Sequence, residues 1–459
     1  MQSKYKVVLK MDLRFYLLKV ELCGIKNIDK PITLKYYNET LRNFNPQKSN
    51  IKAIYGTNGA GKSATINAID IYKELIINDN YLTDRHNISK LIGLINKKTR
   101  ELRIKMTMLL YDIETNKKKC ICCHEIHVKV DDKLDVFINF EKISKINGDN
   151  LNSNKETDIC VIENGNLISS YYVEQMESIK LSTMNLLSKR SIVNILKYDS
   201  LKDESPMFFY ISMIYVFANS LFIELNETDK HNMIFGNELE KYDFSSLFMK
   251  KDEKNKMGNN VTFSSIFEIP QIHHDTDFIL ESRINDYVKK IKNLTYFLKI
   301  FKPELHDIEI ETKELKNMYS CEKIFIYDDY KINSEFESTG IKKLINLYNA
   351  FCSLEKGRVV FIDELDANIH DVYLCKLLEY FNEYSNGQLC FTTHNLAPME
   401  VLSKKKHSID FLSDNSVLTS WKRNGNYSCI NAYRSGMIKN SPFNVEPFDF
   451  IGVFGDKDE

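Results

Sequence analysis

The chain has 459 residues, which is enough for about two to three domains and a substantial hydrophobic core. Its 62 Lys and Arg residues balance 63 Asp and Glu residues, so the formal net charge of −1 excludes a global basic excess as evidence for nucleic-acid binding. The 10 cysteines are scattered and no signal peptide is recognisable, so we expect reduced thiols and a cytoplasmic protein.

The N-terminal part is predicted to contain strands, a glycine-rich loop and a helix. Residues 13–37 alternate apolar and polar side chains, which indicates a strand, a turn near Gly24 and a second strand. Residues 50–56 form a short apolar strand that leads directly into the glycine loop, and residues 62–76 have apolar side chains at helical spacing. Strand, loop and helix follow one another in the order that phosphate binding requires.

Residues 101–158 alternate again and predict an antiparallel sheet lobe with charged hairpin turns. The stretch CICCH at 120–124 fits either strand packing or a metal site. We favour packing, because Cys120 and Cys122 are two positions apart in an alternating stretch and no second ligand pair follows at zinc spacing.

Residues 173–247 are predicted to be mainly helical. Within them, residues 206–223 carry no charge, which meets the lower length limit of a membrane-spanning helix. Ser212 and Asn219 interrupt this run, and no Lys or Arg cluster marks a cytoplasmic side. We therefore expect a buried helix, or a helix covered by a partner subunit, and no membrane association.

Three features follow before the C-terminal part. The highly charged residues 249–260 predict a flexible insertion. The stretch QIHHD, with His273 and His274, indicates a solvated loop rather than a metal site. Residues 276–301 predict a helix that ends before Pro303.

Helices and buried strands alternate beyond Pro303, which predicts an α/β sheet. Strands are expected around 307–312 and 323–329, a loop opening a helix at 334–357, and buried strands at 359–364 and 388–395. We predict an α/β fold made of an N-terminal part (1–172), a helical insertion (173–302) and a C-terminal part (303–459).

A phosphate-binding loop occupies residues 56–63. The stretch GTNGAGKS matches the pattern G-x-x-x-x-G-K-[ST], in which backbone N–H groups and a helix N-terminus surround phosphates. Lys62 would contact the β- and γ-phosphates, and Ser63 would supply a hydroxyl to Mg²⁺. The predicted nucleotide-binding residues are Gly56, Asn58, Gly59, Ala60, Gly61, Lys62, Ser63 and Ala64.

An apolar strand ends in two consecutive carboxylates at VVFIDE, residues 359–364. Carboxylates at the end of a buried strand face either water or a metal. Asp363 is the predicted partner of Mg²⁺. Glu364 is the predicted general base that orients and deprotonates the attacking water.

Further motifs give the chain a resemblance to ABC/SMC-type ATPases. The stretch FESTGIKKL resembles the signature loop of that family, with Ser338 and Gly340 at the positions that reach across a dimer. DELDANIH resembles the Walker B and D-loop segment, and FTTHN matches the switch-histidine strand. The resemblance implies that His394 contacts the γ-phosphate, that ATP and Mg²⁺ are the cofactors, and that the fold is like an ABC/SMC head with an antiparallel β lobe and a helical insertion.

The insertion between the motifs holds no long arms, so the chain is most similar to compact SMC-like ATPases of anti-phage systems. ESTGIKKLINL, IDELDANIH and the terminal SPFNVEPFDFIGVFG resemble the ATPase halves of two-gene abortive-infection systems, the AriA component of PARIS and AbiLi-type proteins among them. That resemblance implies an ATP-dependent dimer or higher oligomer, a phage trigger protein, and a separate toxic effector of the TOPRIM nuclease class. Only 65 residues follow His394 (459 − 394), so we expect no nuclease in this chain.

Two other classes stay open. An SMC/RecF-like DNA-repair ATPase would bind DNA directly, which the balanced charge does not favour. A transporter subunit is disfavoured by the wide spacing of the motifs. Gln175 is either the Q-loop glutamine or an exposed helix residue, and Thr339 and Asp371 depart from the Gly and Pro common in the family.

Overall fold

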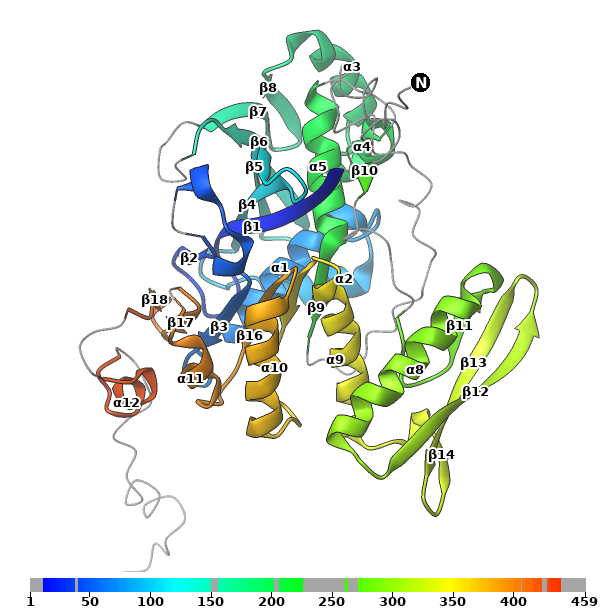
Figure 1. Cartoon of the computed structure of the whole chain (residues 1–459). Coiled ribbons are helices and arrows are strands. Elements are labelled where there is room, and N and C mark those ends of the chain that lie inside the picture. The colour runs from blue at the N-terminus through cyan, green and yellow to red at the C-terminus, as the bar shows by residue number, and fades with distance from the viewer. Residues whose placement is uncertain are drawn as a thin grey trace, which may run out of the picture.

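The structure is a computed structural model that describes residues 11–37, 40–149, 156–201, 206–225, 261–262, 271–405, 407–422 and 427–438. Three sheets organise these residues (Figure 1). The predicted insertion at 249–260 lies outside the described residues.

The central sheet has six strands and carries the predicted phosphate-binding loop. Across the sheet they are β18 (Leu418–Ser420), β17 (Ile409–Leu412), β3 (Ile51–Tyr55), β16 (Gln388–Thr392), β15 (Val359–Ile362) and β9 (Leu221–Glu224). All neighbours pair in parallel except β17 and β18. The middle strands are buried along their whole length, as expected for a parallel sheet covered on both faces. The predicted α/β sheet is confirmed.

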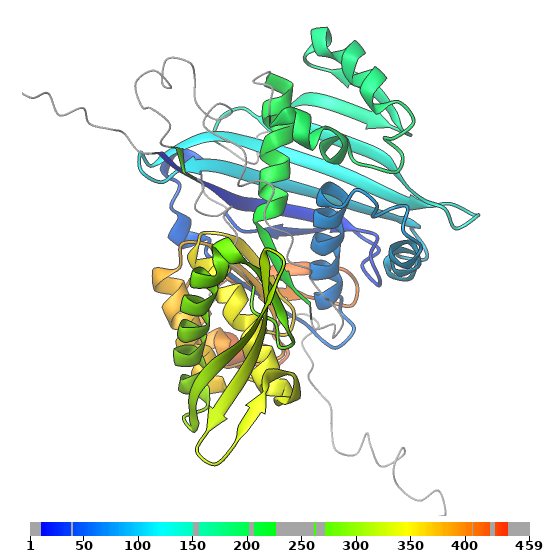
Figure 2. The same ribbon diagram turned by 90° about the vertical axis from the view of Figure 1, so that its right-hand side faces the viewer.

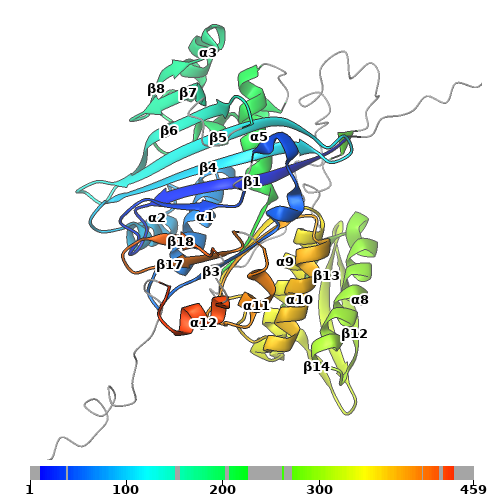
Figure 3. The same ribbon diagram turned by 60° about the vertical axis from the view of Figure 1, so that its left-hand side comes forward.

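Two layers cover the central sheet. Ile54 and Phe361 face the layer of helix α1 (Lys62–Ile77) and the large antiparallel sheet, whereas Tyr55 and Ile362 face the opposite layer. This opposite layer contains α9 (Thr339–Glu355), α10 (Asp371–Tyr384) and α11 (Pro398–Leu402). Because side chains alternate along a strand, each strand contributes to both cores. Figure 3 shows the central sheet between these layers.

The large sheet has eight strands and confirms the predicted antiparallel lobe. Its order is β10 (Val261–Thr262), β1 (Met11–Cys23), β4 (Glu101–Asp112), β5 (Lys117–Val130), β6 (Val136–Ile146), β7 (Glu156–Glu163) and β8 (Asn166–Ser170), and β2 (Ile32–Lys35) also pairs with β1. Only β10 pairs in parallel, with β1. α2 (Arg85–Leu94) lies near β6, and α1 lies between the large sheet and the central sheet, in contact with β4 and β9.

A small third sheet and one helix form a separate lobe, which lies below the large sheet in Figure 2. Its strands are β11 (Asp277–Leu280), β13 (Met318–Tyr327), β12 (Leu305–Leu315) and β14 (Lys331–Asn333), and its helix is α8 (Ile284–Phe301). The prediction of one helix over 276–301 is therefore wrong for its first residues. Asp277 and Ile279 are buried whereas Phe278 and Leu280 are exposed, which is the period of a strand paired with β13.

The expected solvated loop around His273 is also corrected. His273 is half-buried, and its Nδ1 lies 2.7 Å from a carboxylate oxygen of the buried Asp277. Lys323 pairs with the same carboxylate at 2.8 Å and is itself fully buried. This stretch is therefore packed against the small sheet through Asp277, which pairs with Lys323 and forms a hydrogen bond with the His273 ring.

The described part of the segment expected to be helical also contributes one strand to the central sheet. Its helices are α3 (Val173–Thr183), α4 (Ile192–Ser200) and α5 (Pro206–Ser220), and α5 is buried in the core, as expected. The helix ends at Ser220, because residues 221–224 form β9 and pair with β15. The prediction of a helix through residue 223 is wrong there, and the boundaries of the three parts stay predictions. Among the described helices, none has the length and apolar character needed to cross a membrane.

Candidate nucleotide-binding site

The phosphate-binding loop connects β3 to α1 and depends on its glycines. Gly59 has φ +79° and Gly61, the N-cap of α1, has φ +104°, where a side chain would be strained. A Cβ on Gly56 would lie 2.4 Å from the carbonyl oxygen of Leu412, and one on Gly61 would lie 2.8 Å from Ile28. At Gly56 and Gly61 the loop therefore packs too tightly against β17 and the turn after β1 to accommodate a side chain.

Lys62 is the first residue of α1 and lies folded over the loop. It is 6% exposed, and its Nζ donates hydrogen bonds to the carbonyls of Gly56 at 2.9 Å and Thr57 at 3.0 Å. Burial lowers the pKa of Lys62, and nearby carboxylates act in the opposite direction. They are Asp363, Glu364, Asp366 and Asp414. The ammonium group is therefore held at the loop by neutral carbonyls, close to several carboxylates.

The two predicted carboxylates follow β15 and are fixed by a threonine of β16. Asp363 is buried, and its Oδ1 accepts a hydrogen bond from Thr392 Oγ1 at 2.5 Å. The same hydroxyl oxygen accepts from the backbone N–H of Glu364 at 2.8 Å. Glu364 has φ +51°, an uncommon conformation for this residue type that is found more often at functional sites. Thr392 thus fixes the backbone on which both acids stand.

His394 lies two residues beyond β16, at the same edge of the sheet. Its side chain is largely open to solvent, and partial desolvation of the ring, followed by the charge of Lys62, lowers the pKa of His394. It lines a cavity of about 310 Å³ together with Gly56, Thr57 and Asn58. Because β3, β15 and β16 run in parallel, their carboxyl ends bring the loop, the acids and the histidine to one edge.

Several residues at this edge were not predicted from the sequence. Asn27 Nδ2 donates to the Gly59 carbonyl at 2.5 Å, and Thr57 Oγ1 donates to Asp414 at 2.7 Å. Leu396, Tyr433 and Arg434 complete the lining of the cavity. Tyr433 and Arg434 belong to helix α12 (Cys429–Arg434), for which the motifs offer no signal.

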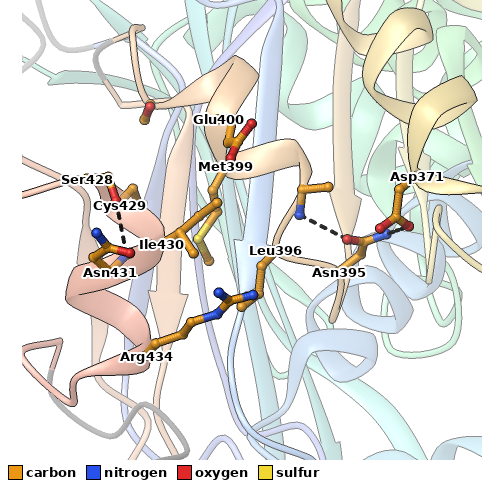
Figure 4. Close-up of a pocket in the computed structure, with 12 residues that line it drawn as sticks. Asp371, Asn395, Leu396, Met399, Glu400, Ser428, Cys429, Ile430, Asn431 and Arg434 are labelled. Atoms are coloured by element: carbon orange, nitrogen blue, oxygen red, sulfur yellow. Dashed lines mark hydrogen bonds between the residues drawn. The ribbon is translucent and has the colours of Figure 1, made fainter.

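A second cavity of about 440 Å³ lies alongside, between α11, α12 and the start of α10 (Figure 4). It shares Leu396 and Arg434 with the first cavity. On its other side Asn395 donates to Asp371 at 2.5 Å. Asp371 therefore connects the start of α10 to the loop that follows β16.

The signature residues lie away from this cavity. Ser338 is the N-cap of α9 and accepts a hydrogen bond from the Ile341 backbone N–H at 3.3 Å. It is exposed, Gly340 is half-buried, and the neighbouring Phe336 is 73% exposed. Neither Ser338 nor Gly340 lines the cavity at the loop of its own chain, and their action across a dimer stays a prediction.

The other predicted positions lie on three elements. Ala60 and Ala64 are buried beside the loop and in α1, whereas Asn58 is exposed. The helix that carries Gln175, α3, packs on β8 at the far end of the large sheet from the loop (Figure 1). The Q-loop interpretation of Gln175 therefore gains no support.

The site fits a nucleotide with Mg²⁺. The N-terminus of α1 and the loop provide backbone N–H donors for phosphate, beside the ammonium group of Lys62. Ser63 in the first turn of α1 and the buried Asp363 offer the oxygen ligands that Mg²⁺ prefers. Asp366 adds a buried Oδ1 with no hydrogen-bond partner among the described residues. This unpaired acceptor is suited to a group that arrives with the ligand.

Fold and site together have the arrangement of a P-loop nucleotide-binding protein, with a glycine-rich loop between a parallel strand and the N-terminus of a helix. A family model described as "AAA domain, putative AbiEii toxin, Type IV TA system" matches residues 189–400, which is less than half of the chain. The match includes the predicted signature, both acids and His394 but begins after the phosphate-binding loop. No curated protein matches the chain.

Two solved structures similar to the chain are SMC heads. One is the Smc head domain of Pyrococcus furiosus with an extended coiled coil, bound to the C-terminal domain of ScpA, at 13% identity and a TM-score of 0.39, covering 89% of this chain and 96% of that one. The other is the Smc head domain of Pyrococcus yayanosii with a coiled coil and joint, at 12% identity and a TM-score of 0.39, covering 89% and 97%.

Proposed function

We propose that the protein binds and hydrolyses ATP and acts as a nucleotide-switched sensor and scaffold in an anti-phage defence system. In this proposal it controls a separate toxic effector, a TOPRIM-type nuclease. One observation carries the ATPase part: the loop with Lys62, the acids Asp363 and Glu364, and His394 meet at the carboxyl edge of neighbouring parallel strands.

The residues divide the work of phosphoryl transfer. Lys62 and the backbone N–H groups of the loop hold the phosphates, and Ser63 and Asp363 hold Mg²⁺. When bound, Mg²⁺ offsets the charge that develops on the phosphate oxygens. Glu364 takes the proton of the attacking water, and His394 contacts the terminal phosphate.

The switch requires a dimer. Ser338 is exposed at the start of α9 and lies away from the cavity of its own chain, so a second subunit can meet it. In a two-fold dimer the signature of each subunit would close the site of the other. The closed form is then favoured only while both sites contain ATP, which makes dimerisation a population shift driven by the nucleotide.

The defence role rests on two pieces of support. The description of the matching family model refers to a toxin and a type IV toxin–antitoxin system. The sequence also resembles the ATPase components of abortive-infection systems of the AriA and AbiLi kind. That resemblance associates an ATPase of this type with a second component, and we assign the toxic role to this separate effector, which a phage protein triggers.

The test uses a variant that binds ATP without hydrolysing it. Wild type, Glu364→Gln and the control Glu379→Gln, an exposed glutamate of α10, are each co-expressed with the neighbouring gene. Mass-resolved sizing is then run with and without Mg-ATP. We expect Glu364→Gln to reduce hydrolysis by about 100-fold or more and to accumulate an ATP-dependent oligomer that retains the neighbour's product.

Two results would contradict the proposal. If Glu364→Gln hydrolyses ATP like Glu379→Gln, then Glu364 is not the base. If it stays monomeric and alone but binds DNA, with an affinity that falls steeply with salt, the SMC/RecF-like repair function takes its place.

A further inference from the structure

Helix α12 is short but firmly placed next to the phosphate-binding loop. The Ser428 side chain caps its start by accepting from the Asn431 N–H at 3.1 Å. At its end, Gly436 has φ +72° and the Met437 N–H donates to the Ala432 carbonyl at 3.0 Å. These are the bonds of a Schellman motif, so both ends of the helix are closed by hydrogen bonds.

An aromatic cluster ties α12 to the strand that enters the loop. Tyr433 is buried and stacks on Phe411 of β17, with ring centroids 5.4 Å apart and an interplanar angle of 24°. Its ring also lies 6.4 Å from that of Tyr55, the last residue of β3. The position of α12 is therefore coupled directly to the residue before Gly56.

Arg434 follows Tyr433 and lies at the junction of the two cavities. Its side chain extends from α12 toward Leu396 in the loop after β16 (Figure 4). It is exposed, and among the described residues it makes no ion pair. The chain thus places an unpaired guanidinium group at the nucleotide site on a helix with fixed ends.

The two cavities differ in charge. The larger cavity is lined by the carboxylates Asp371 and Glu400. The cavity at the loop is lined by Arg434, by His394, whose lowered pKa favours the neutral ring, and otherwise by uncharged residues. Only the cavity at the loop therefore presents positive charge without a carboxylate in its lining, which suits an anion.

We propose that Arg434 binds the γ-phosphate of ATP within the same subunit. The inference rests on the proposed ATP binding at the loop, and it adds a phosphate ligand that no motif predicts. A guanidinium group is planar and donates paired hydrogen bonds to phosphate oxygens, which a backbone loop and a lysine do not reproduce. Because Arg434 shares its cavity with His394, it should distinguish ATP from ADP.

The experiment measures binding of two nucleotides to the full chain by titration calorimetry. Mg²⁺ with the non-hydrolysable analogue adenylyl imidodiphosphate is compared with Mg²⁺ and ADP, for wild type, Arg434→Ala, Arg434→Lys and Lys62→Ala. The control is Arg42→Ala, since Arg42 is also an exposed arginine, with a side chain 82% exposed. We expect Arg434→Ala to weaken binding of the analogue about tenfold and binding of ADP less than about twofold. Arg434→Lys should lose less affinity for the analogue because it keeps the positive charge.

The outcomes separate this inference from the proposed function. Suppose that wild type binds both nucleotides. If Arg434→Ala then has the same affinities as Arg42→Ala, or loses affinity for both nucleotides equally, the γ-phosphate role of Arg434 is wrong while ATP binding stands. If wild type binds neither nucleotide and equals Lys62→Ala, both proposals fail. Thermal unfolding without nucleotide checks that the variants fold, and Arg434→Gln replaces Arg434→Ala if the latter does not.

Discussion

Two histidines in two sheets show how a buried polar group with all its partners differs from one that lines an open cavity. His124, on β5 of the antiparallel sheet, is fully buried, and both of its ring nitrogens have partners: the Tyr72 hydroxyl at 2.9 Å and Glu141 at 3.0 Å. Glu141 in turn accepts from Ser191 Oγ at 2.5 Å and from the Ile192 N–H at 2.9 Å. This network satisfies its own members and leaves nothing for a ligand.

His394 lies at an open edge of the central sheet. Its ring lines a cavity, and the charge of Lys62 and partial burial lower its pKa. Near it, Asp366 has a buried oxygen without a hydrogen-bond partner among the described residues. Polar groups left incomplete in the free protein are those that a ligand can complete, which is why we propose the ligand site at the central sheet and not at the β5 network.

The largest expected effect comes from Lys62→Ala, which tests the open region. Because Lys62 supplies the side-chain ammonium group of the loop, we expect ATP hydrolysis to fall by about 100-fold or more. Burial lowers the pKa of Lys62, so folding disfavours its charge and its removal should not lower the stability of the free protein. Hydrolysis assays and urea unfolding measure the two effects. The control Lys376→Ala changes an exposed lysine of α10, and a variant with normal hydrolysis would contradict the assignment.

Glu141→Gln tests the closed network and should lower the stability of the protein while leaving ATP hydrolysis nearly unchanged, the reverse of Lys62→Ala. A buried carboxylate that accepts from three groups loses its charge, so we expect unfolding free energy to fall by about 3 kcal/mol. Hydrolysis per folded molecule should stay within about twofold, because the network lies away from the site. Urea unfolding and active-site-normalised assays measure both.

The matched control for that variant is Glu125→Gln on the neighbouring strand β5, which pairs with the strand β6 that carries Glu141. Glu125 is half-buried and pairs with His127 at 2.9 Å, so its replacement should change the unfolding free energy by less than about 1 kcal/mol. If Glu141→Gln and Glu125→Gln lower the unfolding free energy equally, the buried Glu141 network contributes no more to stability than a half-buried pair.

Sequence patterns predict a helix or strand correctly where its formation is determined by the residues within that segment. The strand, loop and helix around Gly56 and the alternating strands of the large sheet follow from periodicity within short windows. The sequence pattern predicts helix at residues 221–224 and 277–280, and there it is wrong. Each becomes a strand because of a partner far along the chain, β15 and β13, and a short apolar run does not distinguish a buried strand from a buried helix.

The candidate site divides in the same way. Lys62, Glu364 and His394 are recognisable because their motifs are contiguous and ordered along the chain. Thr392 is positioned by the parallel register that pairs Ile362 with Phe391, which places its hydroxyl beside Asp363. Asn27, Asp414 and Arg434 reach the loop only through tertiary packing, so no local pattern announces them.

The smallest expected effect concerns the protonation of His394. In the free protein burial and Lys62 lower its pKa, with Asp366, Glu364 and Asp363 opposing them, and Arg434 lines the same cavity. At pH values just below the ordinary pKa of histidine, the unfolded chain therefore binds more protons than the folded chain. The contribution of His394 to the stability of the free protein consequently falls as pH falls. A bound triphosphate adds negative charge and raises the pKa again. Nucleotide binding should thus take up protons at His394, and affinity should increase as pH falls through that pH range.

Calorimetry at about pH 6 in two buffers of different ionisation enthalpy measures this uptake, because the buffer supplies the protons. We expect wild type to take up a fraction of a proton more per site than His394→Gln, and the ionisation of the nucleotide cancels in that difference. The control His86→Gln, an exposed histidine of α2, should match wild type. Equal uptake by wild type and His394→Gln would mean that His394, like His124, does not respond to the ligand, and the contrast between the two histidines would then be one of exposure alone.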